Sequence, residues 1–272
     1  MSDRLRHTFE ALKKQGKTAL IPFIMAGDSS AEESASILDA LPAAGADIIE
    51  LGIPFSDPMA DGPSIQAAGG RALSAGMNLR GVLALAQQFR ARHPSVPLIL
   101  MGYYNPVLQM GLELFAEQAA LAGVDGVILV DLPPEEQEDL QPLLQARGIA
   151  FIRLIAPTTG DERLAHLLKN ADGFVYTIAV KGITGAGSST ADALGARIAQ
   201  IRRHTPLPIV AGFGIKTPQQ AAALCGMADG VVIGSALIEA VQASGANTPE
   251  ESALAAQTFI QAIATGMRGT SA

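Results

Sequence analysis

The residues that could do chemistry gather in the stretch IIELGIPFSDPMADGPSIQ, residues 48–66, which carries three carboxylates. Glu50 lies inside an apolar run with the character of a buried strand, and Asp57 and Asp61 follow it. Burial disfavours a charged carboxylate and raises its pKa, which suits a general acid–base group near neutral pH. We therefore predict acid–base catalysis by Glu50. A structural ion pair between Glu50 and Arg153 is the alternative.

The two acids beyond this run are carried by a stiff backbone. Prolines at positions 54, 58 and 63 restrict the segment that contains Asp57 and Asp61, so either carboxylate can be held at a fixed place. Each acid taken alone fits an ordinary turn aspartate. Their joint occurrence beside a buried glutamate favours a functional role.

A second group of residues is rich in glycine. The segments GITGAGSS from Gly182, GFG from Gly212 and GS at Gly234 follow the sixth, seventh and eighth apolar runs. Backbone N–H groups at such corners, together with a helix N-terminus, bind phosphate in barrel proteins. We therefore predict an anion site at Gly214, Gly234 and Ser235. Glycines that only turn corners are the alternative, and the first segment can also form a lid.

Other chemistries find less support in the sequence. The four histidines fall on predicted helices or at their ends, so we predict no metal site. Cys225 is expected on a helix as a small core residue. Lys181 follows the sixth apolar run, where a lysine could form a Schiff base with a carbonyl substrate. Its glycine-rich surroundings favour a solvated charge on the lid instead.

Eight short apolar runs must position these residues. The runs are ALIPFIMAG from Ala19, ADIIELG from Ala46, VPLILMG from Val96, VDGVILV from Val124, IAFIRLIAP from Ile149, DGFVYTIAV from Asp172, LPIVAGFG from Leu207 and ADGVVIGSA from Ala228. Continuous hydrophobicity is typical of parallel strands that are buried on both faces. Eight βα units in 272 residues predict an α/β fold, a (β/α)8 TIM barrel forming a single domain over residues 1–272. An open doubly wound sheet is the alternative, but no Gly-x-Gly-x-x-Gly turn follows the first run.

Helical segments alternate with these runs. They are expected at residues 31–43, 79–92, 113–122, 134–146, 162–169, 191–203 and 218–224. We predict two extra packing helices, an N-terminal one through Leu5 and Phe9 that caps the bottom of the barrel, and a C-terminal one after a capping box formed by Thr248 and Glu251. A weak internal repeat, AGADIIEL, AGVDGVIL, NADGFVYT and MADGVVIG, places an Asp before four of the runs.

Composition narrows the class of protein. A net charge of −7 opposes broad attraction to nucleic acid or to anionic lipid, and favours a small polar ligand. The apolar runs are much shorter than the roughly 20 residues of a membrane-spanning helix. With Cys225 as the only cysteine and no signal peptide pattern at the start, we expect a cytoplasmic protein.

The stretch ELGIPFSDPMADGPSIQ closely resembles the signature of the tryptophan synthase alpha chain family. The similarity extends from PFIMAGD at Pro22 through MGYYNP, VDGVILVDLPPEE, GITGAG and AGFGI to GSALI, and so covers nearly the whole chain. It implies a barrel lyase that cleaves indole-3-glycerol phosphate to indole and glyceraldehyde 3-phosphate. It also implies an alpha2beta2 heterotetramer, in which a beta chain carries pyridoxal phosphate and receives the indole, with no cofactor in this chain.

The resemblance implies roles for individual residues. Glu50 matches the acid–base residue that protonates the indole ring carbon and serves the glycerol hydroxyl, and Asp61 matches the second acid, which favours positive charge on the ring nitrogen. The positions that match the indole pocket are Phe23, Leu100, Leu129, Tyr176 and Val232. Those that match the lid and the phosphate end are Thr184, Gly185, Phe213, Gly214, Gly234 and Ser235. Asp57 and Pro133 lie on loops that face the beta chain in this family.

The chain departs from the family pattern in two places. Ala179 and Val180, followed by Lys181, stand where a Ser-Arg-like pair is expected before the lid, which bears on lid hydrogen bonding and on communication with the partner. Gly102 replaces the usual threonine of the MTYYNP motif. Three alternatives stay open: a free-standing indole-releasing lyase of the same family, a Schiff-base aldolase using Lys181, and a non-enzymatic indole-phosphate binding subunit.

Overall fold

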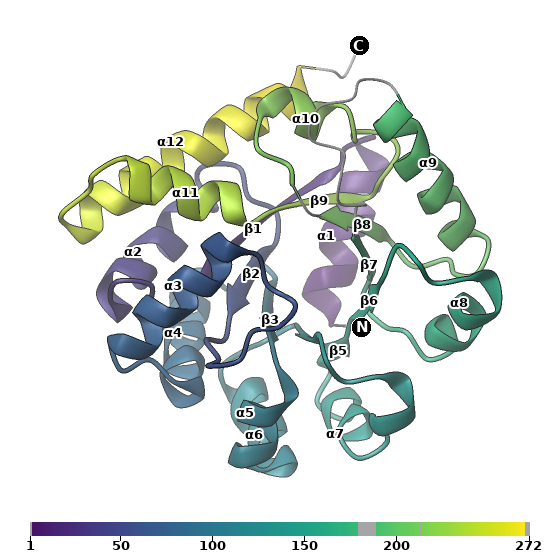
Figure 1. Cartoon of the computed structure of the whole chain (residues 1–272), viewed down its shortest axis with the longest axis horizontal. Coiled ribbons are helices and arrows are strands. Elements are labelled where there is room, and N and C mark those ends of the chain that lie inside the picture. Colours follow the sequence, from purple (N-terminus) through teal and green to yellow (C-terminus); the bar gives the residue numbers. More distant parts are fainter. Residues whose placement is uncertain (1, 179–188, 213, 270–272) are drawn as a thin grey trace.

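The computed structural model describes residues 2–178, 189–212 and 214–269, which form a ring of parallel strands surrounded by helices (Figure 1). The strands are β1 (Ala19–Met25), β2 (Ile49–Gly52), β3 (Leu98–Gly102), β4 (Gly126–Leu129), β5 (Ala150–Phe151), β6 (Arg153–Ile155), β7 (Val175–Ile178), β8 (Ile209–Gly212) and β9 (Gly230–Ile233). Each predicted apolar run contains at least one of them. Their order in the sheet is β5-β4-β3-β2-β1-β9-β8-β7-β6.

The ring closes at the fifth apolar run, which contains both β5 and β6. β5 pairs with β4 through Ala150 and Gly126, and β6 pairs with β7 through Arg153 and Val175. Because only Ile152 separates β5 from β6, the nine described segments occupy eight strand positions. The prediction of a (β/α)8 barrel is therefore confirmed, and the open-sheet alternative is wrong.

The strands are apolar because helices cover one face and the barrel interior covers the other. β1, β2, β4, β8 and β9 are buried at every position. Glu50 is the only ionisable residue in these five strands. An acid in such surroundings is costly to bury, which makes it a candidate for function rather than for stability.

The surrounding helices largely follow the predicted periodicity. They are α1 (Asp3–Lys14), α2 (Ala31–Ala40), α3 (Pro63–Ser74), α4 (Leu79–Arg92), α5 (Tyr104–Met110), α6 (Leu112–Leu121), the 3-10 helix η1 (Pro134–Glu136), α7 (Gln141–Gln145), α8 (Asp161–Leu168), α9 (Ser189–Arg202), α10 (Pro218–Ala222), α11 (Ser235–Ala243) and α12 (Pro249–Arg268). The expected continuous helix over 134–146 is wrong, because Pro142 falls inside that range and a proline there clashes with the preceding turn. Proline is instead accommodated in the first turn of α7.

Three helices, α3, α5 and α11, were not among the predicted segments. α5 and α11 begin within two residues of a strand, α3 begins after the loop that carries Asp61, and each has Gly or Pro at or near its start. In a sequence, Gly and Pro usually indicate a loop. Pro63, however, occupies the first position of α3, where a missing N–H has no cost because it would have no helical partner. The result is that the site loops after β2, β3 and β9 lead directly into helices.

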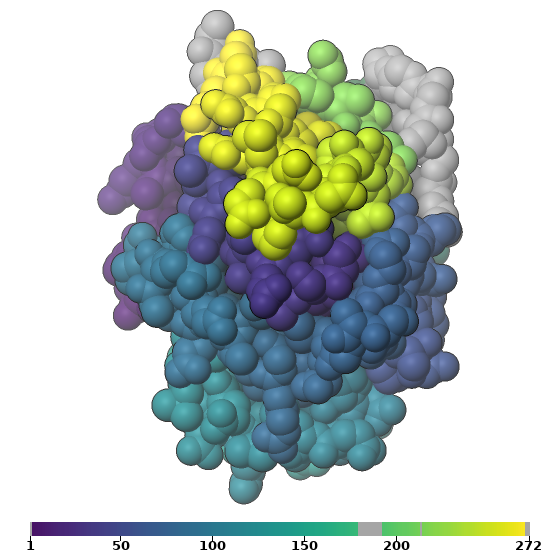
Figure 2. Space-filling model, turned by 90° about the vertical axis from the view of Figure 1, so that its left-hand side faces the viewer, coloured from purple at the N-terminus to yellow at the C-terminus, as the bar shows by residue number. Residues whose placement is uncertain are grey.

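The two extra helices pack as predicted. Leu5 and Phe9 of α1 are buried, and the Phe9 ring lies 5.8 Å from that of Phe174, the residue just before β7. α12 covers α2, α10 and α11 on one flank of the barrel (Figure 2). Its start differs from a full capping box: Thr248 Oγ1 accepts from the Glu251 N–H, but the Glu251 carboxylate accepts from the Asn247 N–H.

The internal repeat has a structural explanation at the bottom of the barrel. Asp47 accepts a hydrogen bond from the Leu20 N–H, Asp125 from the Leu98 N–H, and Asp229 from the Ile209 N–H. In each case an Asp just before one strand, or at its start, binds the backbone of the neighbouring strand. The repeated Asp therefore ties adjacent strands together at their N-terminal ends.

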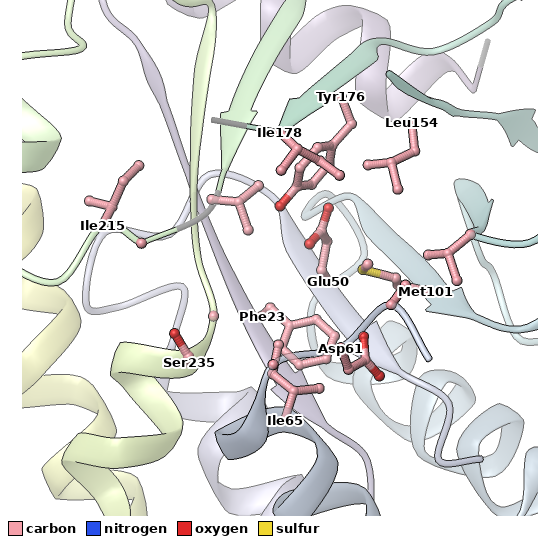
Figure 3. Close-up of a pocket in the computed structure, with 16 residues that line it drawn as sticks. Phe23, Glu50, Asp61, Ile65, Met101, Leu154, Tyr176, Ile178, Ile215 and Ser235 are labelled. Atoms are coloured by element: carbon pink, nitrogen blue, oxygen red, sulfur yellow. The ribbon is translucent and has the colours of Figure 1, made fainter. Parts of the chain in front are cut away.

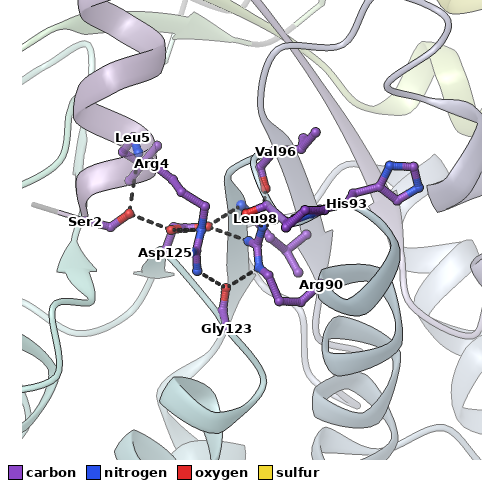
Figure 4. A network of polar contacts seen from close by, with 10 residues as sticks. Ser2, Arg4, Leu5, Arg90, His93, Val96, Leu98, Gly123 and Asp125 are labelled. Atoms are coloured by element: carbon purple, nitrogen blue, oxygen red, sulfur yellow. Dashed lines mark hydrogen bonds and ion pairs between the residues drawn. The ribbon is translucent and has the colours of Figure 1, made fainter.

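Asp125 extends this link to two helices (Figure 4). Its buried carboxylate also accepts from Ser2 Oγ and from Arg4 Nε at 2.9 Å on α1, and from Arg90 Nη2 at 2.7 Å on α4. Four donors from three elements thus satisfy one buried charge, and α1 is fixed across the bottom of the barrel.

α12 spans 20 residues, long enough to cross a bilayer. Within the described ranges, however, no helix combines such length with the apolar character that a membrane span needs.

Candidate active site

Glu50 lies in β2, between β1 and β3, at the positions where Phe23 and Ile99 are its neighbours in register. Its side chain is fully buried and points into a cavity shared with Phe23, Tyr176 and Met101 (Figure 3). Neither carboxylate oxygen has a hydrogen-bond partner among the described residues. Because no hydrogen bond or opposite charge from the part of the chain that the structure describes offsets the cost of burying a carboxylate, the pKa of Glu50 is raised to about 8, and the group holds a proton at neutral pH.

The alternative of an ion pair with Arg153 is not what the structure shows. Leu154, the next residue in β6, lines the cavity, whereas Arg153 lies with its guanidinium 4.6 Å from the centre of the Phe151 ring. The pKa of Arg153 is lowered to about 10 by burial, and the charge that opposes this is Glu135 rather than Glu50. Glu50 is therefore left without a counter-charge from this arginine.

Asp61 reaches the same cavity from the loop after β2. Two contacts hold this loop: Gln66 Nε2 donates to the Asp61 carbonyl at 2.9 Å, and the Ala60 N–H donates to the hydroxyl of Tyr103 at 3.0 Å. Burial raises the pKa of Asp61 to about 6, although a hydrogen bond with the Tyr103 side chain lowers it. At neutral pH this carboxyl is largely ionised.

The two acids therefore differ in charge at the same pH. Glu50 is a proton donor and Asp61 is an anion between about pH 6 and about pH 8. Both face one apolar cavity. Such a pair can protonate a substrate atom and stabilise a positive charge that develops elsewhere on the same molecule.

The cavity walls include most of the predicted pocket residues. Phe23, Tyr176 and Val232 line it from β1, β7 and β9, and all three are nearly buried. The nearby Glu50 carboxylate adds to burial in raising the pKa of Tyr176 well above its ordinary value, so this phenol stays protonated. A flat aromatic ligand fits walls of this kind.

Two predicted pocket residues are corrected by strand register. Leu100 and Leu129 are buried but do not line the cavity, whereas their neighbours Met101 and Val130 do. Side chains alternate between the two faces of a strand, so a shift of one residue exchanges the interior face for the helical face. The sequence resemblance was placed one position too early in β3 and in the run of β4.

Four further apolar residues that the sequence motifs did not identify line the cavity. They are Ile65, Leu154, Ile178 and Ile215. A signal existed for one of them, because Ile178 lies two positions after Tyr176 and therefore shares its face. Ile65 belongs to α3, which was not predicted, so no sequence signal placed it in the pocket.

Two glycines make room for the aromatic walls. A Cβ at Gly52 would lie 2.6 Å from the Phe23 ring, and a Cβ at Gly212 would lie 2.1 Å from the Tyr176 hydroxyl. Both separations are far below van der Waals contact. Glycine at these two strand ends is required so that the rings can turn into the cavity.

The opposite end of the cavity has the features of an anion site. Gly214, Gly234 and Ser235 line it, as predicted. Gly234 precedes α11 and Ser235 is its first residue, so the first N–H groups of this helix and its dipole point toward the cavity. Gly214 has a φ of +76°, a conformation that glycine adopts without strain.

The remaining predicted residues fall into two groups. Thr184, Gly185 and Phe213 lie outside the described residues, as do Ala179, Val180 and Lys181, which leaves the lid and the Schiff-base alternative untested. Asp57 and Pro133 are exposed on the loops that follow β2 and β4. In the described part of the chain, no group of three or more His, Cys, Asp or Glu side chains could hold a metal ion.

A (β/α)8 barrel whose central cavity is faced by one protonated and one ionised carboxyl, with a helix N-terminus at its other end, is typical of a barrel enzyme that works by acid–base chemistry. Comparison with known proteins gives the family. The sequence model of the tryptophan synthase alpha chain matches residues 9–267, so the chain belongs to that family. It is a lyase that cleaves indole-3-glycerol phosphate in tryptophan biosynthesis, which removes the non-enzymatic alternative.

Solved structures agree with this assignment. The tryptophan synthase alpha subunit of Legionella pneumophila str. Paris is 40% identical, with a TM-score of 0.90 over 99% of this chain and 100% of that one. The alpha chain of Legionella pneumophila subsp. pneumophila is 38% identical, with a TM-score of 0.89 and full coverage of both chains. Tryptophan synthase of M. tuberculosis in its aminoacrylate-bound form is 30% identical, with a TM-score of 0.86 over 98% of this chain and 100% of that one.

Proposed function

We propose that Glu50 and Asp61 carry the cleavage of indole-3-glycerol phosphate in this chain. Glu50 donates its proton to the ring carbon that bears the glycerol chain, and the resulting positive charge on the ring nitrogen is stabilised by the Asp61 carboxylate. Glu50, now ionised, accepts the proton of the adjacent glycerol hydroxyl. The carbon–carbon bond then breaks, its electron pair returns to the ring, and indole and glyceraldehyde 3-phosphate are formed.

The difference in protonation state between the two carboxyl groups is the observation that supports this proposal most strongly. The pKa of Glu50 is about 8 because its environment is apolar, and the pKa of Asp61 is about 6. The reaction needs one carboxyl group that carries a proton and a second one that is ionised at the same pH. The protonated indole itself accepts the electron pair, so no metal or lysine is required in the step.

The cavity suggests how the substrate lies. We propose that the indole ring packs between Phe23, Tyr176 and Val232, with Met101 and Val130 in place of Leu100 and Leu129. The phosphate is then bound by backbone N–H groups of Gly214, Gly234 and Ser235. Thr184, Gly185 and Phe213 remain predicted members of the lid and the phosphate end.

We also propose that the chain works with a beta chain. Asp57 and Pro133 are exposed on loops at the same end of the barrel as the site. Met59, two residues after Asp57, is 78% exposed, and Leu108 on α5, the helix that follows β3, is 50% exposed. Both side chains follow strands at this end of the barrel, where a partner chain could cover them. The proposed assembly is an alpha2beta2 heterotetramer in the cytoplasm, with pyridoxal phosphate on the beta chain.

The test is an assay of indole release with the wild type and with Glu50→Gln and Asp61→Asn, each in the presence and absence of the beta chain. Glu50→Gln should abolish cleavage and keep substrate binding, because the amide has nearly the same shape but cannot deliver a proton. Asp61→Asn should lose most of the activity. Unchanged cleavage by Glu50→Gln would refute the assignment.

The same assay separates the remaining alternatives. Release of indole at full rate without the beta chain would identify a free-standing indole-releasing lyase. A covalent adduct trapped by borohydride in the presence of substrate would identify the Schiff-base aldolase that uses Lys181.

A further inference from the structure

Three side chains from separate elements meet beside the cavity, and the function proposed above does not use them. Glu239 on α11 accepts a hydrogen bond from Ser64 Oγ on α3 at 2.7 Å. Its other carboxylate oxygen accepts from Lys216 Nζ at 3.0 Å, on the segment between β8 and α10. One carboxylate therefore joins two parts of the chain that are far apart in sequence.

One arm of this cluster leads to the second catalytic acid. Ser64 is the second residue of α3, and that helix starts two residues after Asp61. Gly62 and Ile65, on either side of Ser64, line the cavity. α3 and α11 pack together and lie side by side in both views (Figures 1 and 2). A bond between Ser64 and Glu239 thus anchors the helix start that fixes where Asp61 lies.

The other arm leads to the anion site. Lys216 follows Gly214 and Ile215, which line the cavity, and Glu239 lies one helical turn after Ser235. A carboxylate one turn into α11 would repel a phosphate at the start of that helix. The ammonium group of Lys216, 3.0 Å away, offsets this charge. The bonds with Ser64 and Lys216 also lower the pKa of Glu239, which keeps it ionised at neutral pH.

The cluster contributes little to folding. The Glu239 and Lys216 side chains are 43% and 50% exposed, and ion pairs this exposed to solvent contribute little to stability. Its position, rather than its strength, distinguishes it from other surface pairs. It bridges the two ends of one cavity, and either end would shift if the bridge were released.

We propose that Glu239 is a positioning residue that couples the phosphate end of the cavity to the segment carrying Asp61. The proposal rests on the function proposed above. Through Ser64, Glu239 holds the start of α3, and through Lys216 it holds a positive charge beside the phosphate. Binding of the phosphate at one end and placement of the carboxylate at the other are then linked through one side chain.

The two arms can be separated by four variants. Ser64→Ala removes the first arm, Lys216→Met removes the second, Glu239→Ala removes both, and Glu239→Gln keeps an oxygen for Ser64 but loses the charge pair with Lys216. The readouts are kcat and KM for indole-3-glycerol phosphate and the Kd of inorganic phosphate by calorimetry. Asp39→Asn is the matched control, because Asp39 forms a similarly exposed pair with Arg92 at 2.8 Å, between α2 and α4.

Ser64→Ala should lower kcat about fivefold, the effect of one hydrogen bond, with the Kd of phosphate unchanged. Lys216→Met should raise KM and the phosphate Kd about two- to fivefold, of order the effect of an exposed charge pair, with kcat nearly kept, because the Glu239 carboxylate is then left without its counter-charge. Glu239→Gln removes that repelling charge and keeps the ammonium group, so neither KM nor the phosphate Kd should rise. Glu239→Ala should lower kcat as Ser64→Ala does, without a rise in the phosphate Kd. Melting temperatures should stay within about 4 °C of the wild type.

Two results would overturn the proposal. In the first, Glu239→Ala behaves like Asp39→Asn in every kinetic readout. In the second, all four variants lose activity in parallel with a fall in melting temperature, which would assign the cluster to stability alone. A failure of the proposed function looks different, since Glu50→Gln would then cleave the substrate normally whatever the Glu239 variants do.

Discussion

The hydroxyl group of Tyr103 accepts a hydrogen bond from the backbone N–H of Ala60 at 3.0 Å, which ties the end of β3 to the loop after β2. Ala60 immediately precedes Asp61, and a side-chain hydrogen bond from Tyr103 lowers the pKa of the Asp61 carboxyl against the larger effect of burial. One phenol thus fixes both the place and the charge of the second acid.

Tyr103→Phe should release the Ala60 N–H and let the pKa of Asp61 rise above about 6, because the effect that opposes burial is lost. We expect kcat/KM at pH 7 to fall about five- to tenfold, the effect of one lost hydrogen bond. Steady-state kinetics measure this. Tyr104→Phe is the matched control, since only the backbone N–H of Tyr104 forms a described hydrogen bond, with Asp131. Equal losses in both variants would contradict the role given to Tyr103.

The rate of cleavage should depend on pH with two limbs. The active form has Glu50 protonated and Asp61 ionised, so kcat/KM should fall as pH drops through about 6 and fall again as pH rises through about 8. A pH–rate profile from pH 5 to 9 measures both limbs. A profile that stays flat across this range would show that these carboxyl groups do not govern the rate.

Glu50 should make the stability of the protein depend on pH. Its pKa is about 8 in the folded chain and 4.5 ordinarily, so the folded state holds this proton more tightly. The resulting stability is present below about pH 4.5 and is lost as pH rises through about 8. Glu50→Gln removes this loss, so the stability of the variant relative to the wild type should grow by up to about 4 kcal/mol between pH 5 and pH 9. Urea unfolding at the two pH values measures it; a constant difference would be the opposing result.

The corrected strand register predicts different effects for two neighbouring residues. Leu100→Ala removes a fully buried side chain from outside the cavity, and should lower the free energy of unfolding by about 2 to 5 kcal/mol with little change in KM. Met101→Ala removes a cavity wall and should raise KM instead. Denaturation and steady-state kinetics on both variants decide the register. The reverse pattern would restore Leu100 to the pocket.

The Asp125 network should matter for stability rather than for catalysis. Asp125→Ala removes the carboxylate that binds both the guanidinium of Arg90 and the N–H of Leu98, and the Arg90 side chain is only 14% exposed. We expect a loss of about 3 to 5 kcal/mol in the free energy of unfolding, because a partner of a buried charge is removed. Asp39→Asn, at an exposed pair, should cost about 1 kcal/mol or less. Similar losses in the two variants, measured by urea unfolding, would show that burial of Asp125 is unimportant.

The barrel was predictable from the apolar runs alone, because burial on both faces of a parallel strand requires a continuous apolar run and each run is short and bounded. It also singled out Glu50, since an acid inside such a run is rare and costly. The Asp before several strands was visible as a repeat, but its role in binding the neighbouring strand became clear only from the hydrogen bonds of Asp47, Asp125 and Asp229.

The three-dimensional structure was needed to show which side chains face the cavity and which of them are charged. A one-residue shift separates Leu100 from Met101, and the motif alone does not fix which of two neighbouring apolar residues turns inward. The contact of Tyr103 with the loop of Asp61 joins residues 43 positions apart. The pKa of a carboxyl depends on what surrounds it in space, and distant segments of the chain supply those surroundings.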